Sequence, residues 1–268
     1  MQREKIIADA VKALSALDGG EIKRRSCLPS RERVRELTDK IGGLLFPYFC
    51  EEKSPSLQAE EIIERMTEQL SFALLERKNE AEKLSEEIFL IFPEIKKRLL
   101  KDALAIYEGD PAAISPSEVI LTYPGFYAIS VYRVAHEFYL RKIPYIPRIM
   151  TELAHERTGI DIHPGASIGE SFCIDHGTGI VIGETTIIGD RVKIYQGVTL
   201  GAKSFELGED GNPVKGVKRH PEIGNDCIIY AGATILGGET KIGDGCTVGG
   251  NVWLTHSLPA GEIIYYKR

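Results

Sequence analysis

Residues 223–248 read IGNDCIIYAGATILGGETKIGDGCTV, and aliphatic side chains recur through this stretch at intervals of six. Ile223, Ile229 and Ile235 follow that spacing, the series slips by one residue to Ile242, and it resumes at Val248. A period of six fits neither an α-helix nor an alternating strand. It is typical of a parallel β-helix, in which each hexapeptide forms one side of a triangular coil and three hexapeptides complete a turn.

The same period extends outward in both directions. Upstream, the aliphatic positions are Ile162, Ile168, Ile174, Ile180, Val192 and Val198, with Thr186 out of pattern, and downstream the series reaches Leu254. Glycine often follows the aliphatic position directly, as in Ile168-Gly169. We therefore expect each aliphatic side chain to point into the prism while the small residue allows a tight corner. This pattern predicts a β-helix domain over residues 156–268.

Residues 203–218 interrupt the repeat. They contain the turn signal Glu209-Asp210-Gly211-Asn212-Pro213, with both an Asp-Gly and an Asn-Pro pair. An insertion in a solenoid emerges as a loop on one face, which is often the binding face. The alternative is a passive surface loop.

Residues 1–155 follow a helical pattern instead. Ser54-Pro55 is a helix start, with a capping side chain before a proline at the first helical position. Three apolar stripes follow at helical spacing: Ile62, Met66, Leu70, Leu74; then Ile95, Leu99, Ala103, Ile106; then Phe126, Ile129, Val134, Phe138. The second stripe is followed by Gly109 and Pro111, which favour a helix end there. The predicted fold class is α+β, with an all-helical domain over 1–155 followed by the β-helix.

Composition excludes several functional classes. The 268 residues carry a net charge of −6 and a pI near 5.6, which argues against a nucleic-acid binder. No stretch approaches the roughly 20 apolar residues of a membrane span, and the N-terminus has no secretory signal, so we expect a cytoplasmic protein without a membrane partner. The five cysteines are odd in number and include no CxxC, which suggests buried small hydrophobes in a reducing compartment.

Three histidines are candidates for chemistry: His163, His176 and His220. Hexapeptide-repeat carbonic anhydrases hold zinc with a His-x4-His pair, which this chain lacks, so we expect no metal. A neutral imidazole is a suitable general base near pH 7 when a carboxylate fixes its tautomer. Asp161 lies fifteen residues before His176, less than one turn of the coil, and is the candidate partner.

Several short strings between residues 80 and 255 occur together. They are residues 161–169 (DIHPGASIG), 174–184 (IDHGTGIVIGE), 198–201 (VTLG) and 219–223 (RHPEI), preceded in the helical half by Asp110-Pro111-Ala112, Gly125-Phe126, Tyr132-Arg133 and His136. Together they resemble the serine O-acetyltransferase family of hexapeptide-repeat acyltransferases. The resemblance implies a left-handed β-helix, trimers of prisms packed side by side, and often hexamers formed through the helical domains. It also implies transfer of acetyl from acetyl-CoA to the L-serine hydroxyl, the first step of cysteine biosynthesis.

The resemblance assigns roles by position. His176 is the base that takes the serine proton, with Asp161 to orient it. Arg219 and His220 meet the serine carboxylate, which a guanidinium fork matches well. Asp110 and Asp175 hold the ammonium group. The remaining assignments are Glu184 at the substrate and Ala202, Ala231 and Gly250 along the pantetheine groove.

The resemblance extends to partners. Acetyl-CoA is a co-substrate and no cofactor is permanently bound. L-cysteine is the expected feedback inhibitor, because it differs from serine by one atom. The pocket draws parts from two chains of the trimer or hexamer, and the helical domain contributes to it.

The chain departs from the family at its last residues. It stops at Tyr265-Tyr266-Lys267-Arg268, without the family's tail ending in isoleucine. Because a terminal Arg is costly to bury, we expect no stable complex with the sulfhydrylase through this terminus.

Two other functions stay open from the sequence alone. One is an acyltransferase of the same scaffold acting on another small hydroxyl acceptor, such as a sugar or a homoserine-like compound. The other is a non-enzymatic trimeric scaffold. Asp110 and Arg219 favour an amino-acid acceptor, because a zwitterion needs both charges met and a sugar needs neither.

Overall fold

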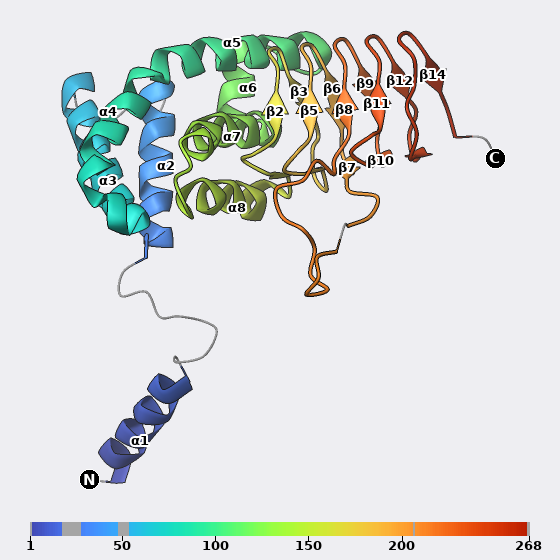
Figure 1. The fold of residues 1–268 in the computed structure, drawn as a ribbon. Coiled ribbons are helices and arrows are strands. Elements are labelled where there is room, and N and C mark those ends of the chain that lie inside the picture. Colours follow the sequence, from blue (N-terminus) through green and yellow to red (C-terminus); the bar gives the residue numbers. More distant parts are fainter. Residues whose placement is uncertain (1, 18–27, 48–53, 206, 267–268) are drawn as a thin grey trace.

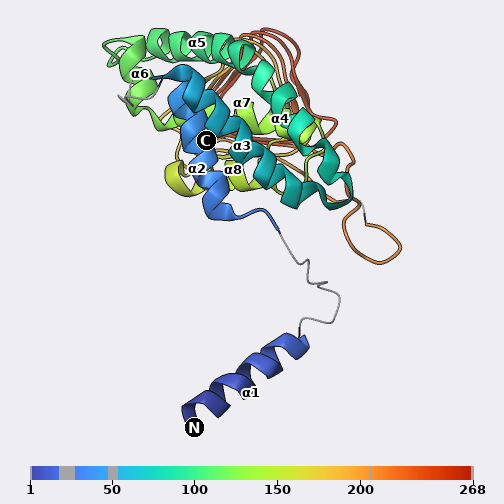
Figure 2. The same cartoon turned by 90° about the vertical axis from the view of Figure 1, so that its left-hand side faces the viewer.

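A computed structural model describes residues 2–17, 28–47, 54–205 and 207–266. The helices are α1 (Gln2–Leu17), α2 (Arg31–Leu45), α3 (Pro55–Leu74), the 3-10 helix η1 (Leu75–Glu80), α4 (Ala81–Leu90), α5 (Phe92–Gly109), α6 (Pro116–Thr122), α7 (Pro124–Leu140) and α8 (Ile146–Thr158). From Asp161 onward the described chain is a parallel β-solenoid whose coils advance away from the helices toward the C-terminus (Figure 1). Figure 2 looks along the solenoid, with α2, α3, α7 and α8 in front of the coils.

The helical boundaries follow the sequence signals. The Ser54 hydroxyl accepts a hydrogen bond from the Leu57 amide at 3.4 Å, which caps α3 as expected. α5 ends at Gly109, followed by Asp110 in an extended conformation. All three apolar stripes are buried between the helices, which confirms them. None of the described helices is long and apolar enough to cross a membrane.

The solenoid has three faces. The first face is β1 (Asp161–Ile162), β4 (Val181–Ile182), β7 (Thr199–Gly201), β10 (Thr234–Leu236) and β13 (Trp253–Leu254). The second is β2 (Ser167–Ile168), β5 (Ile187–Ile188), β8 (Glu222–Ile223) and β11 (Lys241–Ile242), and the third is β3 (Cys173–Asp175), β6 (Lys193–Tyr195), β9 (Ile228–Ile229), β12 (Thr247–Val248) and β14 (Ile263–Ile264). The parallel β-helix prediction is confirmed.

The aliphatic repeat differs in detail from the single series of six. Ile174, Ile182 and Ile188 lie in strands and point into the prism. Ile180 is also buried, but it lies two residues before Ile182 and belongs to a second row of buried side chains outside the strands. The shift arises because the coil that runs from β1 to its partner β4 contains two more residues than the coil that runs from β4 to β7. The two extra residues lengthen the first coil at the Asp175-His176 turn. Thr186 belongs to this second row, where it is buried and its hydroxyl has no hydrogen-bond partner.

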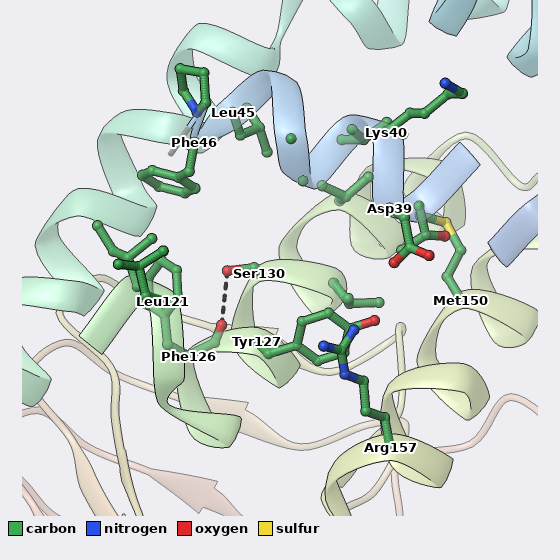
Figure 3. Close-up of a pocket in the computed structure, with 18 of the residues that line it drawn as sticks. Asp39, Lys40, Leu45, Phe46, Leu121, Phe126, Tyr127, Ser130, Met150 and Arg157 are labelled. Carbon is green, nitrogen blue, oxygen red and sulfur yellow. Dashed lines mark hydrogen bonds between the residues drawn. The ribbon is translucent and has the colours of Figure 1, made fainter. Parts of the chain in front are cut away.

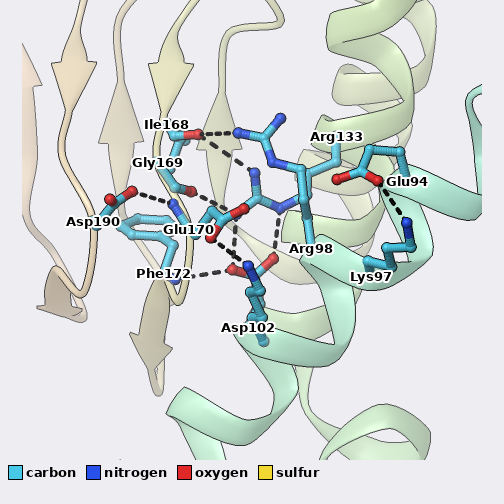
Figure 4. Close-up of polar contacts among 11 residues, drawn as sticks. Glu94, Lys97, Arg98, Asp102, Arg133, Ile168, Gly169, Glu170, Phe172 and Asp190 are labelled. Atoms are coloured by element: carbon cyan, nitrogen blue, oxygen red, sulfur yellow. Dashed lines mark hydrogen bonds and ion pairs between the residues drawn. The ribbon is translucent and has the colours of Figure 1, made fainter.

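A buried ion pair joins the helices to the first coil (Figure 4). The Arg133 guanidinium on α7 donates to both carboxylate oxygens of Asp102 on α5, at 2.5 and 2.7 Å. Asp102 also accepts from the Phe172 amide at 2.9 Å, and Arg133 donates to the Gly169 carbonyl at 2.8 Å. Both charged side chains are inaccessible to solvent, so this network fixes the backbone that leads into β3.

The insertion leaves the solenoid after β7 and hangs away from the coils (Figure 1). Its tip is a turn in which the Gly208 amide donates to the Asn212 carbonyl at 2.8 Å and Gly211 has a positive φ of 75°. The turn expected at residues 209–213 is therefore confirmed. Cys173, Cys227 and Cys246 are free and buried, while Cys27, Cys50, Lys267 and Arg268 lie outside the described residues.

Candidate active site

The candidate residues gather at two edges of the prism, on either side of its first face. The His176 corner is the edge where the third face turns into the first, and it holds Asp175 and His176. The Arg219 corner is the edge where the first face turns into the second, and it holds Glu184, Arg219 and His220. One chain thus places the two groups of residues on different edges.

Backbone geometry explains the glycines around His176. His176 adopts a left-handed φ of 59°, which histidine tolerates better than most residues. Gly177 follows with a φ of 92°, and a Cβ there would lie 2.5 Å from the Ile160 side chain. The turn therefore presents the imidazole to solvent, where 74% of it is exposed, with Nε2 3.9 Å from Asp175 Oδ1.

Two acids from different halves of the chain meet at the His176 corner. Asp110, just after α5, accepts hydrogen bonds from the Ala112 amide at 2.8 Å and the Tyr123 hydroxyl at 2.7 Å. These two bonds lower the pKa of the Asp110 carboxyl. Asp175 pairs with the Lys193 ammonium at 2.9 Å, and Lys193 also donates to the Gly109 carbonyl at 2.7 Å. Lys193 thereby joins Asp175 to the backbone immediately before Asp110.

Lys193 and Tyr123 were not anticipated from the sequence. Lys193 lies in β6, where the hexapeptide pattern predicts an ordinary outward-facing charge. Its partner Asp175 lies in β3 of the preceding coil, which the local sequence around Lys193 does not reveal. Tyr123 precedes α7 and shows its role only through its hydrogen bond to Asp110. No sequence signal pointed to Lys193, because its contact with Asp175 depends on how successive coils stack.

The Arg219 corner is a second polar network. Arg219 Nη2 lies 2.6 Å from Glu184 Oε2, and the Tyr139 hydroxyl donates to Glu184 Oε1 at 2.9 Å. Burial raises the pKa of Glu184, but these two partners outweigh it and lower the pKa overall. Glu184 therefore stays ionised and holds the guanidinium in place.

His220 is held as a neutral ring. Its Nδ1 accepts from the Thr185 amide at 3.1 Å and lies 2.9 Å from the Thr185 hydroxyl, which itself accepts from the Arg219 and His220 amides. Nδ1 is thus the acceptor, and Nε2 carries the proton. The ring packs on Gly183, where a Cβ would lie 2.1 Å from it. Burial lowers the pKa of His220 to about 4.

This shift predicts how stability depends on pH. The pKa of His220 is lower in the folded chain than the ordinary 6.5, so the unfolded chain binds more protons between pH 6.5 and 4. We expect acidification through that window to lower the free energy of unfolding by at most about 3 kcal/mol more in wild type than in His220→Gln. Urea unfolding of both proteins at pH 7 and pH 4.5 measures the difference. Equal losses in the two proteins would show that His220 titrates normally.

Asp161 occupies the first strand of the first face. Its carboxylate lies within 4.8 Å of the ligand atoms of Glu152 and His155 on α8. Among residues 54–205, no ion pair joins Asp161 to His176, so the isolated chain does not form the expected dyad. The three grouped side chains include two common surface acids, and we assign no metal to them.

His163 and His136, the other two histidines in the motifs that resemble the family, contact the backbone of the first coil. His163 Nδ1 accepts from the Gly165 amide at 3.0 Å, its ring meets Tyr139 edge-on, and burial lowers its pKa. His136 Nδ1 lies 2.7 Å from the Pro164 carbonyl oxygen. Both fix the first coil against α7.

The three residues expected along the pantetheine groove lie at the same two edges of the prism. Ala231 and Gly250 lie below His176 on successive coils of the His176 corner, and a Cβ on Gly250 would lie 3.1 Å from the Ala231 carbonyl. Ala202 follows β7 at the Arg219 corner. A cavity of about 740 Å³ there is lined by Glu184, Arg219 and the insertion, including Phe205 and Val214.

A parallel prism of hexapeptide coils, with acids beside an exposed imidazole, fits the hexapeptide-repeat acyltransferase class that the sequence resembles. Residues 53–131 match the family model for the N-terminal domain of serine acetyltransferase. By these comparisons and those that follow, the chain belongs to the serine acetyltransferase family.

Two curated relatives illustrate the similarity. A plasmid-encoded serine acetyltransferase of Synechococcus elongatus is 57% identical over 184 residues, covering 69% of this chain and 57% of the relative. The chain thus spans little more than half the length of that relative. A Bacillus subtilis serine acetyltransferase is 45% identical over 163 residues, covering 60% of this chain and 70% of the relative.

Solved structures agree with the fold. Entamoeba histolytica serine acetyltransferase 1, in complex with L-cysteine, is 38% identical with a TM-score of 0.79, covering 86% of each chain. Soybean serine acetyltransferase complexed with serine is 31% identical with a TM-score of 0.59, covering 88% of this chain and 96% of that one. The expected family and fold class are confirmed.

Proposed function

We propose that this protein transfers the acetyl group of acetyl-CoA to the hydroxyl of L-serine, giving O-acetylserine and CoA. One observation carries the proposal: Asp110 and Asp175 converge beside an exposed imidazole, His176. Asp110 and Asp175, the latter also paired with Lys193, can accept hydrogen bonds from an ammonium group, and a base beside them matches a hydroxyl on the neighbouring carbon. The family relationship supports the same reaction.

His176 acts as general base in this proposal. Its free nitrogen takes the serine hydroxyl proton as the oxygen forms a bond to the thioester carbonyl carbon. The tetrahedral intermediate then expels the CoA sulfur, which recovers the proton from the imidazolium. Asp161 is proposed to orient the ring, although no ion pair joins the two side chains in the described residues.

The Arg219 corner is proposed to bind the substrate carboxylate. Glu184 holds the Arg219 guanidinium, and the neutral His220 offers one Nε2–H donor and no charge. Arg219 therefore supplies the cation, while His220 contributes either a further bond to the carboxylate or a donor to the oxyanion of the intermediate. Ala202, Ala231 and Gly250 are proposed to line the pantetheine groove.

The division between two edges favours a site shared by two copies. The ammonium side and the base lie at the His176 corner, and the carboxylate side lies at the Arg219 corner. Packing of prisms side by side would bring one corner of each kind together. We propose a homotrimer, or a hexamer joined through the helical domain of residues 1–155, as the active form in the cytoplasm, with no permanently bound cofactor.

The proposed reaction is tested by thiol release. Purified protein is mixed with acetyl-CoA and each amino acid in turn, with a simple sugar and homoserine as alternative acceptors. Serine-dependent CoA release is the expected result. Release with the sugar and none with serine would overturn the proposal.

Cysteine is expected to inhibit competitively with serine. It retains both charged groups, so Asp110, Asp175, Arg219 and His220 meet it as they meet serine. We expect Asp110→Asn and Arg219→Gln each to weaken cysteine binding by about tenfold or more, because a charge-assisted bond is lost. Calorimetry with cysteine, using Lys241→Gln on the same solenoid as the control variant, measures this. Unchanged binding in a double variant of Asp110 and Arg219 would rule out the shared site.

A further inference from the structure

Lys193 on β6 contacts both halves of the chain at the His176 corner. Its ammonium lies 2.9 Å from Asp175 Oδ2 and donates to the Gly109 carbonyl at 2.7 Å. It also lies 4.6 Å from the centroid of the Tyr195 ring. Gly109 ends α5 and directly precedes Asp110, so one side chain of the solenoid contacts the acid on β3 and the helix end that carries the other acid.

The ion pair of Lys193 with Asp175 is mostly buried. Only 17% of the lysine side chain and 16% of the aspartate side chain are exposed, so water screens the two charges little. Burial lowers the pKa of the Lys193 ammonium, but Asp175 and Tyr195 outweigh it and raise the pKa overall. Lys193 therefore stays charged. The strand lysine Lys241 differs, because it is 64% exposed beside Glu222.

Lys193 fixes which way the Asp175 carboxylate faces. It holds Oδ2, while Oδ1 lies 3.9 Å from His176 Nε2. That separation is too long for a hydrogen bond, so within the described residues Oδ1 remains available to another donor beside the imidazole. A substrate ammonium on Oδ1 would bring the substrate hydroxyl toward the base.

Asp110 is held separately, by the helical half. Its carboxylate accepts from the Ala112 amide at 2.8 Å and from the Tyr123 hydroxyl at 2.7 Å. Tyr123 also lines a cavity of about 460 Å³ between α2, α3, α7 and α8 (Figure 3). Among the described residues, Lys193 is the side chain whose polar contacts reach both the Asp175 carboxylate and the backbone next to Asp110.

The charges of these side chains match one ammonium group. The pKa of Asp110 is lowered chiefly by the Ala112 amide and the Tyr123 hydroxyl, and the charge of Lys193 acts in the same direction. Asp110 and Asp175 carry two negative charges and Lys193 carries one positive charge, which leaves one negative charge at the site. Without Lys193, two carboxylates would face the substrate with no cation between them and the helix end.

We propose that Lys193 is the positioning residue of the serine ammonium site, turning Asp175 Oδ1 toward the substrate and leaving the site the single negative charge that one ammonium matches. Lys193 does not touch the substrate and acts through Asp175. The inference rests on the proposed function. It concerns a residue outside the strings that resemble the family, which stop at Glu184 and resume at Val198.

Lys193→Met tests the inference, because methionine keeps most of the side-chain length and removes the charge. In steady-state kinetics we expect KM for serine to rise about tenfold or more, while kcat and KM for acetyl-CoA change less than about threefold. Calorimetry with serine alone should show a similar loss of affinity. Lys241→Met removes a strand lysine from its partner Glu222 and should leave these values at wild type.

Two further variants separate positioning from a purely structural role. Lys193→Arg retains donors for both partners and should keep KM for serine within about threefold of wild type. A double variant of Lys193→Met and Asp175→Asn should bind serine no more weakly than Asp175→Asn alone, because Lys193 acts through Asp175. Losses that add fully, or equal rises in KM with methionine and arginine, would show that Lys193 does not position Asp175.

The inference and the proposed function fail in different ways. If wild type acetylates serine and Lys193→Met keeps its KM for serine, the inference alone is wrong. It is also wrong if that variant loses kcat while its KM stays unchanged, because serine binding would then not depend on Lys193. Absence of serine-dependent CoA release by wild type would instead contradict the proposed function, which the inference requires.

Discussion

Replacing His176 with alanine lowers kcat by roughly 10²- to 10⁴-fold, the usual contribution of a positioned general base. The side chain is 74% exposed, and its ion pair within the described residues is the 3.9 Å approach to Asp175. The oligomeric state and thermal stability should therefore stay close to wild type. Steady-state kinetics with serine and acetyl-CoA, together with light scattering, measure both effects.

His256 provides the matched control. It is an exposed histidine on the last coils of the same solenoid, so His256→Ala should keep wild-type turnover. Near-normal kcat in His176→Ala would remove His176 from the mechanism. A loss of activity accompanied by dissociation would show that its role is structural.

Replacing Asp102 with alanine should destabilise the protein by about 3–5 kcal/mol, because the buried Arg133 guanidinium loses its carboxylate. Asp102 also anchors the Phe172 amide, so the start of β3 loosens at the same time. For a domain of this size we expect the melting temperature to fall by about 10 °C. Differential scanning calorimetry measures the change.

Two variants sharpen this prediction. Glu94→Gln breaks the exposed pair with Lys97 on the same helix and should shift stability by less than about 0.5 kcal/mol. The double variant Asp102→Leu, Arg133→Met removes both charges and should be less damaging than Asp102→Ala. If Asp102→Ala melted within a degree of wild type, the ion pair would not hold the two halves together.

The solenoid could be predicted from the sequence because its repeat leaves a direct signal. Every hexapeptide must bury one aliphatic residue, so Ile223, Ile229 and Ile235 mark strand centres without knowledge of the rest. The shift of register at Ile180 was missed because Ile180, Val192 and Val198 in the second row keep the period of six, and only Thr186 interrupts it.

The part of the candidate site that could be predicted consists of residues that are adjacent in the sequence. Asp175 and His176 share one turn, and Arg219 and His220 share another. Lys193 was missed because its contact with Asp175 depends on the stacking of successive coils. The pairing of Asp161 with His176 was inferred from distance along the chain, which does not reveal that the Asp161 carboxylate lies near α8.

Separation of the two corners has a genetic consequence if neighbouring copies share each site as proposed. An allele damaged only at His176 and an allele damaged only at Arg219 would each be inactive alone. Co-expressed, they would assemble mixed oligomers in which the intact edge of one product faces the intact edge of the other. Such a cell would regain part of its activity from two null alleles, and damage at either edge would behave as partly dominant over wild type.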